Sequence, residues 1–110
     1  MSAADPIVIV GAARTPMGAF QSDFASLSAH DLGGAAIAAA VQRAGVPPDQ
    51  VDEVLFGNCL MAGQGQAPAR QAAFKGGLPK GRLRRVRLRS RQEYLFPPAQ
   101  PPSTRCAARA

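Results

Sequence analysis

The stretch that most constrains the fold is residues 51–79, VDEVLFGNCLMAGQGQAPARQAAFKGGLP. Its apolar run Val54–Phe56 stops at Gly57-Asn58, and a loop rich in glycine and glutamine follows. Pro68 suits the first turn of a helix, and Gly76-Gly77 suit its end. The pattern predicts a strand, a loop and a helix in immediate succession.

A second apolar run lies near the start of the chain. Pro6–Val10 shows no alternation, which is typical of a strand covered on both faces in a parallel sheet. Ser28 is the predicted N-cap of a helix that continues to Ala44 and ends at Gly45. This helix is rich in small residues, which let a helix lie close to its neighbours. Together with a second strand predicted over residues 52–60, these elements make a right-handed βαβ unit with parallel strands.

The glycine after the first apolar run does not open a dinucleotide site. That fingerprint needs G-x-G-x-x-G, whereas Ala13 follows Gly11 at the second glycine position and Pro16 stands where the helix would begin. Residues 14–27 are instead predicted as a loop, with three of its apolar side chains returning to the core. These three are Phe20, Phe24 and Leu27.

Three blocks of this sequence occur in the same order in a known family. They are GAARTPMG at residues 11–18, FGN at residues 56–58 and GQGQAPARQAA at residues 63–73. Through them, residues 5–80 resemble the amino-terminal region of the thiolases, the acetyl-CoA C-acetyltransferases. The resemblance implies an α/β fold, here an incomplete thiolase amino-terminal domain of βαβα order over residues 1–81. It also implies acyl-CoA thioesters as the substrates of intact relatives, no separate cofactor, homo-oligomeric relatives, and a helix at residues 67–71 that frames the site and the subunit contact.

The composition changes abruptly after residue 80. Residues 1–80 carry five Lys/Arg and six Asp/Glu, whereas residues 81–110 carry eight and one. Every glycine lies at or before Gly81, and four of the ten prolines lie between Pro97 and Pro102. Residues 82–110 are therefore predicted to be an Arg/Pro-rich basic tail that is non-native or disordered.

The resemblance fails where the thiolase nucleophile is expected. In the family a strand leads to Asn-Lys-Met-Cys-Gly-Ser-Gly, whose cysteine begins a helix that stabilises the thiolate. Residues 80–91 read KGRLRRVRLRSR instead. If that motif, followed by Met, is written in permitted codons and read one base later, it encodes Thr-Arg-Cys-Ala-Ala-Arg-Ala and a stop, which matches residues 104–110. We therefore expect a shifted reading frame, with Cys106 as its remnant, truncation before the nucleophile and no activity for this chain alone.

No residue of this chain is predicted to be catalytic, cofactor-binding or metal-ligating. Cys59 follows the second predicted strand, but its neighbours supply neither a base nor a cation to activate the thiol. His30 has no cysteine or second histidine near it in sequence, and we interpret it as an ordinary helix residue. Arg14 can anchor a partner loop or an anion, but a structural hydrogen-bonding role is the favoured interpretation.

Two other functions stay open at this point. The basic segment Arg82–Arg91 could contact nucleic-acid phosphates, although its arginines alternate with Leu and Val and few aromatics lie nearby, so nucleic acid is disfavoured. The chain could also dock on a full-length relative through an unpaired sheet edge, or aggregate. No signal peptide or membrane-spanning run is evident, and a cytoplasmic location is expected.

Overall fold

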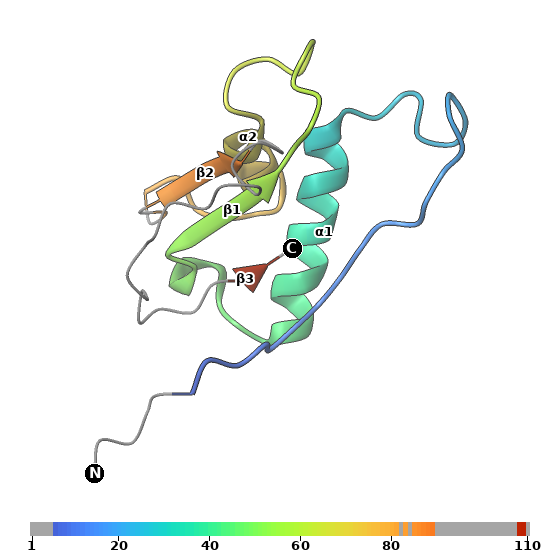
Figure 1. The fold of residues 1–110 in the computed structure, drawn as a ribbon. Coiled ribbons are helices and arrows are strands. Elements are labelled where there is room, and N and C mark those ends of the chain that lie inside the picture. The colour runs from blue at the N-terminus through green and yellow to red at the C-terminus, as the bar shows by residue number, and fades with distance from the viewer. Residues whose placement is uncertain (1–5, 82, 84, 90–107, 110) are drawn as a thin grey trace.

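The computed structural model describes residues 6–81, 83, 85–89 and 108–109 (Figure 1). These residues form a small α/β layer structure whose order along the chain is helix, strand, helix, strand, strand. The elements are α1 (Ala29–Ala44), a 3-10 turn at Pro48–Gln50, β1 (Glu53–Gly57), α2 (Pro68–Lys75), β2 (Arg85–Arg89) and β3 (Ala108–Arg109).

Helix α1 begins and ends at the predicted residues. Ser28 is the N-cap, and it forms a capping box in which its side chain accepts from the backbone of Asp31 and the Asp31 carboxylate accepts from the Ser28 amide. Gly45 closes the helix with φ of 65°, and its N–H bonds to the carbonyl of Gln42. Only glycine adopts this left-handed conformation without cost, so the helix ends where the chain reaches Gly45.

The three strands form a parallel sheet in the order β2-β1-β3, with β1 in the centre. Strand β1 pairs with β2 over its whole length, from Glu53 opposite Arg85 to Gly57 opposite Arg89. Its other edge pairs with β3 at Val54 and Leu55 alone. The parallel arrangement confirms the predicted fold class, an α/β structure with parallel strands.

Both helices cover the same face of the sheet (Figure 1). Val54 of β1 belongs to a buried cluster with Ile37 of α1 and with Ala72 and Ala73 of α2, and Phe56, two residues further along β1, packs against that cluster. Leu78, after α2, completes the cluster. No large side chain of the described residues is completely buried, because the core consists mostly of alanines and single aliphatic residues.

The two helices approach closely because small residues line their contact. A Cβ added to Gly34 of α1 would lie 2.7 Å from the Cβ of Lys75, and one added to Gly76 would lie 2.6 Å from Cγ2 of Ile37. At Gly33 it would lie 3.0 Å from the ring of Phe56. Carbon atoms prefer separations of about 3.5–4.0 Å, so larger side chains would push the helices apart. This confirms the expectation drawn from the small residues of α1.

The first apolar run does not form the predicted strand. Ile7 is 88% exposed and Ile9 is 92% exposed, and residues 6–10 have no strand partner within the part of the chain described here. In Figure 1 this segment runs past the C-terminal end of α1, outside the sheet. Both edges of β1 are paired with β2 and β3, so residues 6–10 do not lie beside β1 in the sheet. Three side chains of the following loop were predicted to return to the core. Phe24 is half-buried, but Phe20 at 91% exposure and Leu27 at 46% do not return to it.

Part of the basic tail also departs from its prediction. Residues 85–89 form β2, with Val86 and Leu88 half-buried and Arg85 and Arg87 exposed. This alternation is the signature of a strand with one face on a core. Apart from Leu83 and β3, the rest of the predicted tail, including Cys106, lies outside the described residues.

Candidate functional site

The candidate site is the loop at the carboxyl end of β1, residues 58–66, which leads into α2 (Figure 1). In parallel sheets, ligands bind beyond the carboxyl ends of the strands, so this loop is where the fold would place a site. Gly63 and Gly65 have φ of 73° and 74° and let the loop turn sharply. Ala67 takes a left-handed conformation with φ of 50° directly before Pro68, the first residue of α2.

Side-chain amides hold this loop in a defined shape. Nδ2 of Asn58 donates to Oε1 of Gln64 at 2.7 Å, and Nε2 of Gln64 donates to the carbonyl of Leu60 at 2.6 Å. The backbone N–H of Leu60 in turn donates to Oδ1 of Asn58 at 3.2 Å. Gln71 of α2 reaches back and donates to the carbonyl of Gln66 at 2.7 Å. The loop is therefore clamped at its strand end and at its helix end.

The sequence did not predict this amide clamp. An asparagine directly after a strand can accept from the N–H two residues later, and that signal was available at Asn58. The pairing of Asn58 with Gln64 could not be foreseen, because it depends on the path of a loop whose turns are set by the two glycines. The clamp orders the loop, but amides neither accept nor deliver protons at neutral pH, so it offers positioning and not acid–base chemistry.

Cys59 lies in this loop as an exposed free thiol. The hydrogen bonds that surround it come from amides and backbone groups, and none of the bonds around the loop involves a histidine, a carboxylate or a cation. A nucleophilic cysteine needs a base or a positive field to become a thiolate. The structure thus places Cys59 near a strand end but supplies no partner among the described residues that would activate it.

The two other residues considered from the sequence lie apart from the loop network. Arg14 is an exposed residue in the long segment before α1, and its role stays a prediction. His30 is half-buried in the first turn of α1, and its Nδ1 is buried without a hydrogen-bond partner. No group of three or more His, Cys, Asp or Glu among the described residues could hold a metal ion.

An ion pair joins the two helices, between the first turn of α1 and the last residue of α2. Nζ of Lys75 on α2 donates to the carboxylate of Asp31 on α1. This bond, followed by the bonds from Ser28, holds the pKa of Asp31 well below its ordinary value of 3.8, since hydrogen bonds to a carboxylate favour its charged form. Asp31 therefore stays ionised at any physiological pH, and its role is to fasten α1 to α2.

Comparison with known proteins identifies the origin of this arrangement. The model of the thiolase N-terminal domain matches residues 7–85, well over half of the chain. The chain belongs to the thiolase family. The match includes α1, β1, the clamped loop and α2, and it ends at the first residue of β2.

Individual thiolases agree over the same part of the chain. An acetyl-CoA acetyltransferase from Yarrowia lipolytica is 61% identical over 72 residues, which are 66% of this chain and 18% of the relative. A mitochondrial acetyl-CoA acetyltransferase from Xenopus tropicalis is 60% identical over 72 residues, covering 66% of this chain and 17% of the relative. The structure of an Ascaris suum thiolase in complex with coenzyme A superimposes with a TM-score of 0.71 at 36% identity, covering 76% of this chain and 21% of that one.

The chain thus spans about a fifth of the length of these relatives. The comparisons confirm the resemblance to acetyl-CoA acetyltransferases and leave the tail beyond residue 85 without a family match. A boundary at residues 81 and 82 stays a prediction. Relatives described as mitochondrial and as cytosolic both match, so a cytoplasmic location also stays a prediction. Within the described residues, none of the helices is long and apolar enough to cross a membrane.

Proposed function

We propose that this chain is the amino-terminal part of an acetyl-CoA acetyltransferase, and that it contributes scaffold rather than a nucleophile. The observation that carries the proposal is the match of residues 7–85 to the thiolase N-terminal domain. Intact thiolases transfer an acetyl group between CoA thioesters, in the direction of acetoacetyl-CoA synthesis or of thiolysis. On this proposal residues 58–66 help to shape such a site, and the reacting cysteine comes from elsewhere.

The proposal includes that the 110-residue polypeptide does not turn over acyl-CoA by itself. Cys59 is the only cysteine of the described part, and it lies among amides without a base or a cation. Thiolysis needs a thiolate that attacks the acyl carbon, and it needs donors for the oxyanion that forms there. The described residues around Cys59 supply no group that would generate the thiolate.

We further propose that residues 82–110 derive from a shifted reading frame of a thiolase gene. Residues 80–91 stand where the nucleophile segment is expected, and residues 104–110 match that segment read one base later. The nucleotide sequence of the gene tests this directly. A thiolase nucleophile motif in the alternative frame is the expected result, and any other motif there would remove the explanation.

Activity is tested on the purified chain with acetoacetyl-CoA and CoA, with an intact acetyl-CoA acetyltransferase as the positive control. We expect no thiolysis and no transfer of radiolabelled acetyl to the protein. The matched variant is Cys59→Ser, which should behave like the unchanged chain. If the chain turns over acetoacetyl-CoA and Cys59→Ser abolishes this turnover, Cys59 is the nucleophile and the proposal is wrong.

A second candidate is binding to nucleic acid through the exposed arginines of β2. Arg85 and Arg87 lie on the same face of the strand, but Arg85 is already 3.8 Å from Glu53 in an ion pair. Charge alone produces binding that disappears as salt rises. Sequence-selective binding that persists at physiological salt would favour this candidate over the scaffold function.

A further inference from the structure

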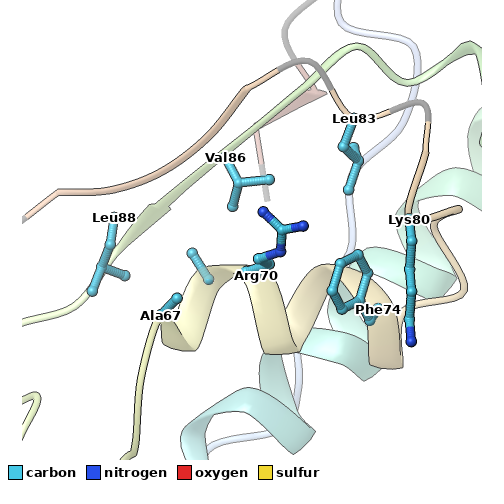
Figure 2. A pocket seen from close by; sticks show the side chains of 8 residues that line it. Ala67, Arg70, Phe74, Lys80, Leu83, Val86 and Leu88 are labelled. Carbon is cyan, nitrogen blue, oxygen red and sulfur yellow. The ribbon is translucent and has the colours of Figure 1, made fainter.

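A hollow of about 230 Å³ lies between α2 and the segment that leads into β2 (Figure 2). One wall is helix α2, which contributes Ala69, Arg70 and Phe74, together with Ala67 directly before the helix. The other wall is apolar and consists of Leu83, Val86 and Leu88, and Lys80 lines one end. The hollow is separate from the loop at residues 58–66, and nothing in the proposed function uses it.

The charges that line the hollow are all positive. The guanidinium of Arg70 lies 5.3 Å from the centre of the Phe74 ring, and Nζ of Lys80 lies 5.5 Å from the same centre. Figure 2 shows the Arg70 guanidinium rising from α2 toward Val86, whereas the Lys80 amine lies on the far side of the Phe74 ring. No aspartate or glutamate is among the lining residues. Among the described residues, Arg70 is thus the cation that points toward the apolar wall.

This combination of groups selects a particular kind of ligand. A guanidinium donates two parallel N–H bonds to a planar carboxylate, and its contact with an aromatic face helps to fix its orientation. The apolar wall opposite Arg70 suits a hydrocarbon chain. An apolar cavity of about 150 Å³ holds benzene, so a hollow of this size takes about nine non-hydrogen atoms. We propose that the hollow binds a short-chain alkyl carboxylate, with its carboxylate on Arg70 and its chain against Val86 and Leu88.

Two residues of the apolar wall lie outside the family match. Val86 and Leu88 lie beyond residue 85, where the match to the thiolase N-terminal domain ends. The proposed site is therefore argued separately from acyl-CoA chemistry. Its failure would leave the proposed function intact, because that function rests on residues 7–85.

The test uses the full 110-residue chain at low salt and compares four probes by ligand-observed NMR and calorimetry. These are acetate, butanoate, hexanoate and hexan-1-ol. Each buried methylene is worth about fourfold in affinity, so hexanoate should bind at least roughly tenfold more tightly than acetate. Hexanol lacks the charge and should bind much more weakly than hexanoate. Added hexanoate should also slow amide exchange in residues 85–89, because it bridges β2 to α2.

Variants at two exposed arginines separate the site from general attraction to a basic protein. Arg70→Gln keeps most of the side chain and should weaken hexanoate binding roughly tenfold or more, whereas Arg14→Gln, which removes the same charge outside the hollow, should leave it unchanged. Arg70→Lys keeps the charge but lacks the two parallel N–H donors of the guanidinium, and it should give an intermediate loss of hexanoate affinity. The proposal is overturned if hexanoate does not bind, if acetate or hexanol binds equally well, or if both glutamine variants lose the same affinity.

Discussion

Replacing Ile37 by alanine tests whether the small cluster between α1, α2 and β1 holds the fold. The Ile37 side chain is 5% exposed and belongs to one buried cluster with Val54, Ala72, Ala73 and Leu78. Its Cγ2 atom occupies the space beside Gly76 that a larger side chain at that position would need. Truncation therefore removes apolar atoms from the centre of the core and leaves a void between closely packed helices.

The expected cost follows from the number of carbons removed. Ile37→Ala deletes three carbons, and each buried methylene contributes about 0.8 kcal/mol, which gives about 2.4 kcal/mol before the cavity is counted. With the cavity the total loss should be about 3–4 kcal/mol, which is roughly a few hundredfold in the folding equilibrium constant. A domain with so few buried side chains has at most about 5 kcal/mol of stability, so the variant should keep at most about 2 kcal/mol and should unfold at a much lower urea concentration.

The assay is urea denaturation followed by the helical circular dichroism signal, since the chain contains no tryptophan. Ile9→Ala is the matched control, because it makes the same chemical change at a side chain that is 92% exposed. It should change the free energy of unfolding by no more than about 0.5 kcal/mol. Equal losses in the two variants would refute the reasoning. They would show that residues 6–10 are packed in solution, as the sequence pattern had predicted.

Two further perturbations probe the contact between the helices. The folded pKa of Asp31 lies below its ordinary value of 3.8, so the bond from Lys75 contributes stability above that pH, and this contribution is lost as the pH falls through the folded pKa. In urea titrations, acidification below about pH 4 should therefore destabilise the unchanged chain more than the Asp31→Asn variant. Equal losses of stability in the two proteins would contradict this expectation. Gly76→Ala places a Cβ 2.6 Å from Ile37 and should lower the free energy of unfolding by about 1–3 kcal/mol. Gly77→Ala meets no atom within 4 Å and should lower it by about 1 kcal/mol, because the φ of Gly77 is 86°. If thermal melts give the reverse order, the helices can separate freely.

Local sequence was sufficient to predict both helices. The N-cap of α1 at Ser28 and its end at Gly45 depend on hydrogen bonds and backbone angles within a few residues, so they can be recognised without the rest of the fold. The same holds for α2, which begins at Pro68 and ends before Gly76. The small residues of α1 also predicted its close contact, although they did not say that α2 would be the partner.

The segment that forms β2 also carries a strand pattern in its sequence. Val86 and Leu88 alternate with arginines, and this period of two is the pattern of a strand with one buried face. The high positive charge of residues 82–110 predicts a disordered tail, whereas the alternation of Val86 and Leu88 with arginines predicts a strand. The structure shows that β1 offers an edge on which the alternating segment can pair, so that its apolar residues reach the core while its arginines stay in water.

The candidate loop shows the same division between local and distant causes. The glycines at residues 63 and 65 and the end of β1 could be predicted to form a turn, and family resemblance placed residues 63–73 in a thiolase. The amide clamp could not be predicted from the sequence. Its hydrogen bonds join Asn58 to Gln64 and Gln71 to Gln66, and these residues meet only after the loop has folded back on α2.

By itself, the sequence determined where the helices begin and end, that a strand lies within residues 52–60, and which family the chain resembles. Only the tertiary structure decided which apolar segments pair. Residues 6–10 have the composition of a central strand but remain exposed, whereas residues 85–89 join the sheet. The physical reason is that a helix satisfies its backbone hydrogen bonds within itself, whereas a strand needs an edge supplied by residues far away in the chain.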